Sequence, residues 1–318
     1  MSDRVLAPDI VDPLVADDTQ TERTTGLWRD TLRSVLRQRS AVIGLIILGL
    51  LVFTAVFAPL IATHDPDGRL LGVEPGVKLR AAPCIHLLGC PADQPQHLFG
   101  TDGNFRDVFS RVVYGARTSL IVGLAAIGFA IFIGTTIGAL AGYMSGWVDN
   151  TFMRFMDVIL AFPSLLLAIA ILTAAGPSLV NALLAIGIVA IPIYARVARA
   201  SVLSAKENDY VTASRALGES TWGVLTRRIM PNSITPIVVA GTLGIGAAVL
   251  EIAALAFIGV TGDVSRAEWG SMIGLERNQL FSAPHIILAP GIAIVLTVLA
   301  FNLLGDGLRD ALDPRLNR

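Results

Sequence analysis

The amino-acid sequence predicts an all-α membrane protein with six transmembrane helices. Its 318 residues are 53% hydrophobic and only 15% charged, whereas a soluble domain usually carries about 25% charged residues. Six apolar segments come close to the roughly 20 residues that cross the hydrocarbon core of a bilayer as a helix. Only helices are expected there, because lipid cannot satisfy unpaired backbone groups. The segments are residues 40–62, 119–143, 158–175, 179–195, 234–260 and 286–304.

The N-terminal segment, residues 1–39, is expected to be a polar cytoplasmic tail that ends in a helix lying on the membrane surface. In residues 26–40 the apolar side chains share one helical face and four arginines lie off it, as in interfacial helices. A simple positively charged flank is the alternative. The first span follows at residues 40–62 and contains no charged residue.

Both cysteines of the chain lie in the long excursion that follows, residues 63–118. Five residues separate Cys84 from Cys90, a spacing that permits a disulfide in an oxidising compartment. A metal site that combines both cysteines with His86 and His97 is the alternative, although the paired spacing of such sites is missing.

The end of this excursion, residues 105–117, is expected to form an amphipathic helix on the membrane surface. Phe105, Val108 and Val112 lie near one face of that helix, and Arg106 and Arg111 lie elsewhere.

A polar insert, residues 205–231, interrupts the five-span core that extends over residues 119–304. Its first helix is expected over residues 206–217, with an apolar stripe at i, i+3 and i+7. Gly218 is expected to end that helix in a left-handed conformation, and a second short helix is expected to stop at Pro231. The two helices predict a docking surface for another protein, and a lid packed on the chain's own spans is the alternative. The candidate docking residues are Asp209, Tyr210, Ala213, Ser214, Leu217, Gly218, Glu219 and Ser220.

Glu251 is the only charged residue within the predicted spans. A carboxylate there costs about 3 kcal/mol on insertion scales and suggests a functional site. We expect it to face a partner subunit or the translocation path, and a hydrogen bond to neighbouring backbone is the alternative. Pro163 is expected to bend the third span, and glycines spaced along residues 134–142 and 241–246 predict close helix packing.

The distribution of basic residues predicts cytoplasmic N- and C-termini. With this orientation the cytoplasmic segments, including the tail 305–318, hold 16 of the 24 Lys and Arg residues, and the short segments on the other side hold two. The remaining six lie in the excursion 63–118, and loops of that length obey the positive-inside rule weakly.

Three segments resemble one family of membrane proteins. Residues 100–120 (GTDGNFRDVFSRVVYGARTSL) resemble the segment before the second span in inner-membrane subunits of dipeptide and oligopeptide ABC importers. Residues 251–259 (EIAALAFIG) and residues 305–314 (GDGLRDALDP) are similar to two further motifs of that family. Phe105 stands where the family usually has glycine, so the turn there is expected to differ.

The insert resembles the coupling loop of type I ABC importers, which sits in a groove of the ATPase. The family spacing of a glycine, nine residues and an I-x-L-P motif is kept from Gly218 to Pro231. Thr212, Ala213 and Ser214 replace the family's E-A-A, and Thr212 cannot make the charged contact of a glutamate. By this resemblance the chain is identified as a C-type permease subunit of the dipeptide/oligopeptide (peptide/nickel) type I ABC importer family.

The resemblance implies a transport subunit of the bacterial plasma membrane that binds no cofactor itself. Its expected partners are membrane lipid, a homologous permease, two ATP-binding subunits that carry ATP and Mg, and an extracytoplasmic substrate-binding protein. Peptides are the expected substrate, with nickel chelates, glutathione or heme as alternatives. A membrane enzyme or a lone channel is the alternative class, but the sequence contains no P-loop, HExxH, GxSG or GxGD motif. Nucleic acid is not an expected partner, because no basic run is interleaved with aromatic residues.

Overall fold

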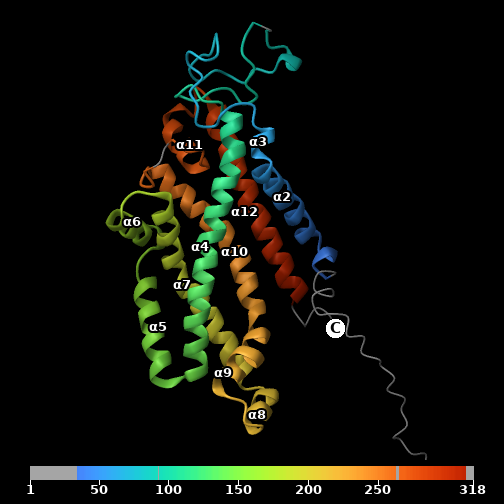
Figure 1. Ribbon diagram of the computed structural model, residues 1–318, viewed down its shortest axis with the longest axis vertical. Coiled ribbons are helices and arrows are strands. Elements are labelled where there is room, and N and C mark those ends of the chain that lie inside the picture. Colours follow the sequence, from blue (N-terminus) through green and yellow to red (C-terminus); the bar gives the residue numbers. More distant parts are fainter. Residues whose placement is uncertain (1–33, 92, 263–264, 313–318) are drawn as a thin grey trace, which may run out of the picture.

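The computed structural model describes residues 34–91, 93–262 and 265–312. Over these ranges the chain is a bundle of long helices without a β-strand (Figure 1). Five helices, with α10 extended back to Thr221, are long and apolar enough to cross a membrane. These are α2 (Arg39–Val56), α4 (Val108–Met144), α7 (Leu179–Lys206), α10 (Met230–Ile258) and α12 (Pro284–Leu312).

The sixth candidate span is a bent pair of helices, and the bend expected at Pro163 in the segment 158–175 is confirmed. Helix α5 (Gly146–Leu160) begins well before that range, and α6 (Ser164–Ala175) leaves it at an angle of 91° (Figure 1). Pro163 precedes α6 directly, with an extended ψ of 128°. Proline has no N–H and crowds the preceding turn, which favours a helix break at this position.

The first span is also broken. Helix α2 ends at Val56, and α3 (Ala58–Ile61) follows after Phe57 instead of a single helix over residues 40–62. The expected surface helix over residues 26–40 lies mostly outside the described residues, as do residues 1–33 of the N-terminal tail and the last six residues of the C-terminal tail.

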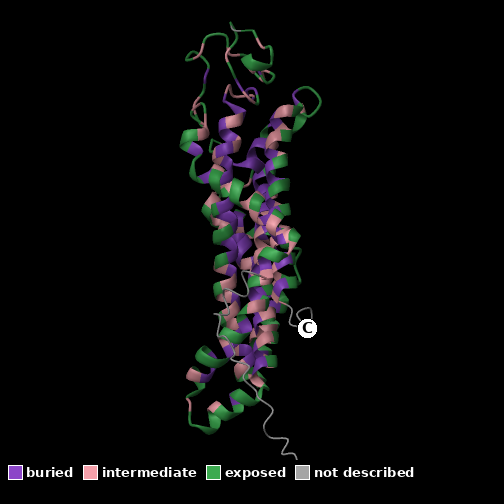
Figure 2. Ribbon diagram, turned by 90° about the vertical axis from the view of Figure 1, so that its right-hand side faces the viewer, coloured by how far each residue is buried: buried purple, intermediate pink, exposed green. Residues whose placement is uncertain are grey.

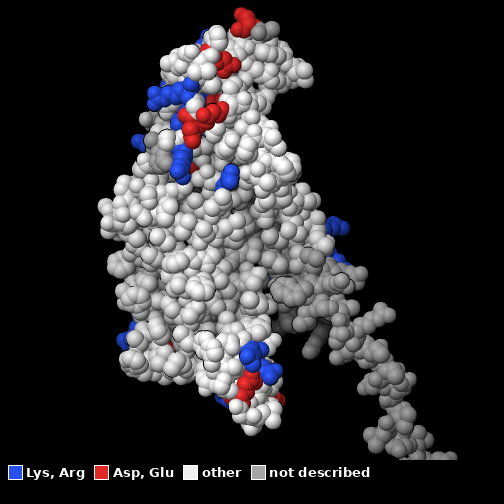
Figure 3. All heavy atoms as spheres, viewed as in Figure 1, with Lys and Arg blue, Asp and Glu red and all other residues white. Residues whose placement is uncertain are grey.

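Two polar regions lie at opposite ends of the bundle. The outer loop, defined here as residues 62–107, caps one end, and the insert, residues 209–229 with α8 and α9, lies at the other (Figure 1). Figure 3 shows acidic and basic side chains gathered at these two ends, and between them an uncharged band with a few basic side chains at its edge. This distribution fits a bundle that crosses a membrane between the loop and the insert.

The core lies where α4 packs on α7, and buried residues line the inner faces of the helices (Figure 2). Gly134, Gly138 and Gly142 face α7, where a Cβ on any of them would meet backbone atoms of that helix. The prediction that these glycines allow close helix packing is therefore confirmed.

Three predicted helix boundaries differ from the structure. Residues 108–117 are the first turns of α4 and not a separate surface helix. Lys206 ends α7, and the insert helix begins only at Asp209. Pro231 lies in the first turn of α10, directly after the π-helical turn Val224–Ile229, so the chain stays helical through it and does not stop there.

Candidate coupling and translocation sites

The two helices of the insert meet at Gly218. Helix α8 (Asp209–Ala216) ends before it, and the φ of Gly218 is +82°. The Glu219 N–H donates to the Ser214 carbonyl at 3.1 Å, which closes the helix end in the manner of glycine-terminated helices. A Cβ on Gly218 would meet no atom within 4 Å. The position therefore favours glycine for its backbone conformation and not for lack of space.

The second arm of the insert continues into the next membrane helix. The Ser220 hydroxyl accepts a hydrogen bond from the Gly223 N–H and so caps α9 (Thr221–Gly223). A π-helical turn, η2 (Val224–Ile229), then joins α9 to α10 without a break. A displacement of this arm is therefore passed directly to α10.

One face of the insert is fixed to the bundle. Val211, Val224 and Ile229 are fully buried and form an apolar cluster with Val202 of α7 and Ala139 of α4. Trp222, on the same arm, is 65% exposed and lies outside this cluster.

The opposite face of the insert is open, and the predicted stripe lies on it. Leu217 is 89% exposed, and Tyr210 and Ala213 are also exposed. Among the other predicted docking residues, Asp209, Gly218 and Ser220 are exposed, and Ser214 and Glu219 are half-buried. Polar contacts within the chain hold three of these side chains. Glu219 accepts from Arg228 Nε at 3.0 Å, Ser214 donates to the Tyr210 carbonyl, and the Tyr210 hydroxyl accepts from Asn232.

Glu251 lines a cavity of about 180 Å³ beside the break between α5 and α6. The Ser164 hydroxyl, at the start of α6, donates to Glu251 Oε1 at 3.3 Å. The partner is therefore a side chain of a neighbouring helix and not the backbone that the alternative interpretation expected. The rest of the lining is mainly apolar and comes largely from α7 and α10, including Ile193 and Ala247.

Helices α7 and α10 connect this cavity with the insert. Tyr194 of α7 is 2% exposed and fills space left by Gly244 of α10, where a Cβ would collide with the phenol oxygen. Ion pairs between Arg199 and Asp149, and between Arg196 and Asp157, tie α7 to α5. The helices that form most of the cavity wall, α7 and α10, are therefore the same helices that contact the insert.

At the other end of the bundle, the charged residues of the predicted family motif form a buried network. Asp102 accepts from Arg106 Nε at 2.7 Å, and both residues are 5% exposed. Arg111 is fully buried in α4 and donates to the carbonyls of Pro66 and Arg266. Periodicity places Arg106 and Arg111 on a surface helix, and the structure buries both of them.

Asp107 caps α4, and its carboxylate accepts from the Ser110 N–H at 2.8 Å and from His97 Nδ1 at 3.0 Å. Burial alone would raise the pKa of this carboxyl, but these hydrogen bonds outweigh burial and hold the pKa below its ordinary value. Phe105 precedes this cap with a φ of +60°. Phenylalanine therefore makes a left-handed turn at the position where the resemblance predicts glycine.

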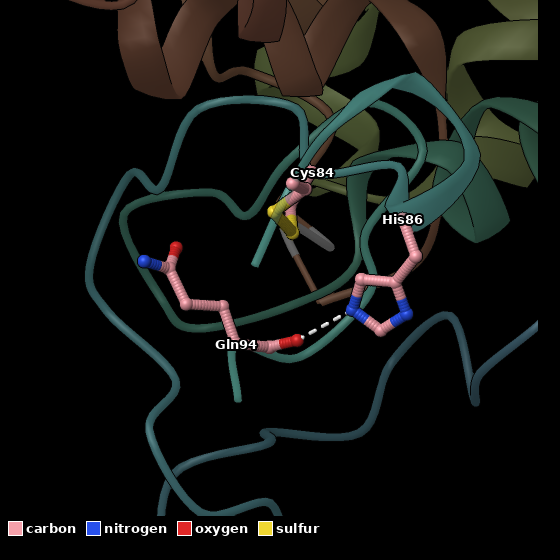
Figure 4. Close-up of a disulfide and its surroundings, with 4 residues drawn as sticks. Cys84, His86 and Gln94 are labelled. Carbon is pink, nitrogen blue, oxygen red and sulfur yellow. Dashed lines mark hydrogen bonds between the residues drawn. A yellow bond between two sulfur atoms is a disulfide. The ribbon is translucent and has the colours of Figure 1, made fainter. Parts of the chain in front are cut away.

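Cys84 and Cys90 form a disulfide in the outer loop (Figure 4). The His86 ring is hydrogen-bonded through Nε2 to the Gln94 carbonyl at 2.8 Å (Figure 4). His97 pairs with Cys84 through backbone hydrogen bonds, and its ring is directed to Asp107 instead. The two sulfurs and the two histidines therefore form no joint metal site.

Comparison with known proteins agrees with this architecture. Residues 134–318 match the family model described as "Binding-protein-dependent transport system inner membrane component", and residues 26–83 match "N-terminal TM domain of oligopeptide transport permease C". The dipeptide transport system permease protein DppC of Alkalihalophilus pseudofirmus is 43% identical over 91% of this chain and 90% of its own length. The glutathione transport system permease protein GsiD of Pectobacterium atrosepticum is 39% identical over 91% of both chains. The di/tripeptide transport system permease protein DppC of Pseudomonas aeruginosa is 40% identical over 89% of this chain and 91% of its own length. These matches, together with the open insert and the helix-lined cavity, show that the chain belongs to the inner-membrane components of binding-protein-dependent transport systems, as a C-type permease subunit of the dipeptide/oligopeptide ABC family.

Proposed function

We propose that this chain forms half of the translocation pore of an ATP-driven importer for di- or oligopeptides. A homologous permease supplies the other half, two ATPase subunits carry ATP and Mg, and a substrate-binding protein delivers the peptide. In this arrangement the insert and both termini face the cytoplasm, and the outer loop faces the binding protein. The distribution of Lys and Arg supports this orientation.

The observation that carries the proposal is the two-sided insert. A docking helix must be rigidly attached to its own chain and still present free apolar surface to its partner. Val211 and Ile229 supply the attachment, and Leu217 and Ala213 supply the free face. A lid packed on its own spans would not leave a leucine 89% exposed.

The packing also offers a route from ATP hydrolysis to the pore. Closure of the ATPases would move the insert, and the insert is continuous with α10 and packs on α7. Both helices line the cavity at Glu251, so their rigid-body movement would change its shape. This is the hinge-and-shear behaviour expected of an alternating-access transporter.

Glutathione is the second candidate substrate, because a glutathione permease is 39% identical to this chain over almost its whole length. Glutathione is itself a tripeptide, so the same pore chemistry would serve both. Uptake by the reconstituted importer, measured with labelled dipeptides, longer peptides and glutathione in competition, separates the two candidates.

Glu251 is proposed to act in the translocation path. Glu251→Gln keeps the size of the side chain and its ability to accept from Ser164, so assembly is expected to be normal and peptide uptake is expected to fall severalfold. Ser164→Ala removes the hydrogen bond alone and serves as the control. Normal uptake by Glu251→Gln would show that the carboxylate is only structural.

Co-purification tests the docking proposal. The tagged chain is isolated in mild detergent from membranes of its native host, as wild type, Leu217→Glu and Trp147→Glu. Trp147 is the matched control, since it is 80% exposed at the start of α5 and lies outside the insert. We expect an ATPase and a second permease with the wild type and with Trp147→Glu, and loss of the ATPase alone with Leu217→Glu. Recovery of the wild type without any ATPase would contradict the proposal.

A further inference from the structure

Three side chains of the outer loop, two histidines and one glutamate, point their ligand atoms toward one another. The proposed transport function assigns no role to this cluster. His64 follows α3, Glu74 lies in the middle of the loop, and His97 lies near its end. One ligand atom from each lies within 4.8 Å of the other two. His97 is 1% exposed, whereas the side chains of His64 and Glu74 are 21% and 27% exposed.

The hydrogen bonds around the two histidines leave one nitrogen of each ring free. Asp107 already accepts from a backbone N–H as a helix cap, so His97 Nδ1 must donate to this carboxylate at 3.0 Å. His64 Nδ1 lies 2.9 Å from the Thr63 hydroxyl, which in turn donates to Asp107 at 3.4 Å. Both rings therefore turn Nε2 toward Glu74.

The distances to Glu74 exclude direct hydrogen bonds. Glu74 Oε2 lies 3.6 Å from His64 Nε2 and 3.5 Å from His97 Nε2, too far for a hydrogen bond. Glu74 Oε2 and His97 Nε2 are also buried without a hydrogen-bond partner among the described residues. Polar atoms left in that state destabilise a fold by about 1–3 kcal/mol each.

The same distances suit a shared metal ion. Zinc bonds of about 2.0–2.2 Å to histidine nitrogen and carboxylate oxygen place neighbouring ligand atoms of a tetrahedral site about 3.3–3.5 Å apart. The three ligand atoms lie up to 4.8 Å apart, so the His64 ring, which is 21% exposed, would move slightly to complete the set. A carboxylate that orients a zinc-binding histidine through its other nitrogen is a usual second-shell arrangement, and Asp107 holds His97 in this way.

We propose that His64, Glu74 and His97 bind a zinc ion in the outer loop. The ion would join the exit of the first span, the middle of the loop and the residue that contacts the α4 cap. It would thus fasten the loop to the start of α4 at a point separate from the disulfide. The fourth position would be left to water or to a group from outside the chain.

Metal analysis of the full-length chain in detergent tests this proposal. The protein is stripped with a chelator, incubated with zinc, desalted and measured for metal per chain. We expect one zinc ion for the wild type. His97→Gln and Glu74→Gln each remove a direct ligand. Loss of a second-shell partner typically lowers metal affinity about 10–100-fold, so the zinc affinity of these variants is expected to fall further than that. His86→Gln is the matched control, because His86 lies in the same loop and binds Gln94 instead.

X-ray absorption of the zinc-loaded protein separates this site from a cysteine site. Nitrogen and oxygen neighbours with imidazole scattering support the assignment, and a sulfur neighbour would move the metal to Cys84 and Cys90 and overturn it. No retained zinc in a wild type with normal helix content, or equal zinc in Glu74→Gln and the wild type, would also overturn it. Preferential retention of iron over zinc would refute the choice of metal.

Proteolysis gives a readout that needs no transport assay. Arg69 is exposed and lies in the chain between the first two proposed ligands. If trypsin cuts there only after the metal-free loop opens, zinc at 100 times its Kd should slow cleavage about 100-fold. The same zinc concentration should leave cleavage of Glu74→Gln unchanged, and slowing of both proteins alike would contradict the site.

Discussion

The contact between α4 and α7 makes a quantitative prediction for Gly134→Ala. A Cβ at this position would lie 2.6 Å from the Ile191 carbonyl oxygen, 2.8 Å from Tyr194 Cβ and 3.0 Å from the Ala195 N. Moving the carbonyl oxygen out to an ordinary contact of 3.4 Å takes about 0.8 Å. All three neighbours belong to the backbone or lie next to it, so the two helices must separate.

Gly128 on the same helix provides the matched control. A Cβ there would meet no atom within 4 Å, so Gly128→Ala should only gain the helix propensity of alanine, about 0.5–1 kcal/mol. Both variants gain that propensity, and the difference between them isolates the clash. Overpacking of a well-filled core costs about 1–3 kcal/mol, so Gly134→Ala should be the less stable variant by that amount.

Thermal unfolding in detergent, followed by size-exclusion chromatography of the surviving protein, measures this difference. Each kcal/mol corresponds to about 2–4 °C in Tm for chains somewhat shorter than this one. We expect Gly128→Ala to melt at or slightly above the wild-type temperature and Gly134→Ala to melt several degrees below Gly128→Ala. Equal melting temperatures for the two variants would refute the close packing of α4 on α7.

Three further predictions follow from single positions. Gly218→Ala should destabilise the end of α8 by about 1–2 kcal/mol, because alanine disfavours the left-handed backbone there. The amide of Glu219 should then exchange about 5–30-fold faster, and Gly218→Asn should have a smaller effect. Unchanged exchange in Gly218→Ala would contradict a left-handed turn at this position. At position 105, where φ is +60°, Phe105→Gly should be about 1 kcal/mol more stable than Phe105→Ala, and the reverse order in thermal melts would exclude a left-handed turn. Burial raises the pKa of the Glu268 carboxyl above 4.5 despite hydrogen bonds from Gly270 and Ser271. The protonated form therefore stabilises the fold, and ionisation destabilises it. The stabilisation is fully present below pH 4.5 and is lost as the pH rises through the raised pKa. The Tm of the wild type relative to Glu268→Gln should therefore be highest at and below pH 4.5 and decline toward neutral pH. A difference that does not change with pH would contradict this.

The long helices could be predicted because each needs only local information. Apolar length and helix geometry indicate where α2, α4, α7, α10 and α12 cross, and small residues at every fourth position indicate where two of them touch. The right-angle bend at Pro163 could not be predicted in the same way. Proline indicates that a helix is interrupted, but the size and direction of the bend depend on what packs on either side.

In the candidate sites too, features set by local sequence could be predicted, and features set by distant partners could not. Gly218 was identified from the residue type that a left-handed corner requires, and the exposed stripe on α8 followed from helical spacing. The buried charges at Asp102 and Arg111 were missed, because burial of a charge depends on partners that lie far away in the chain, such as the Pro66 and Arg266 carbonyls of Arg111. Nothing in the spacing of the histidines indicated the convergence at Glu74, since it arises only when the outer loop folds back on the start of α4.

The central claim is that the open face of the insert binds an ATPase, and cross-linking tests it most directly. The two cysteines of the chain are joined in a disulfide, so Ala213→Cys introduces a single free thiol on the exposed face of α8. The complex is cross-linked in native membranes with a short thiol-to-amine reagent, with Trp147→Cys as the control at the start of α5. Our account predicts a cross-link from position 213 to an ATP-binding subunit, with a yield that changes when ATP is added, and none from position 147. Absence of any ATP-binding subunit from the position 213 product, in membranes that contain the assembled importer, would contradict the account.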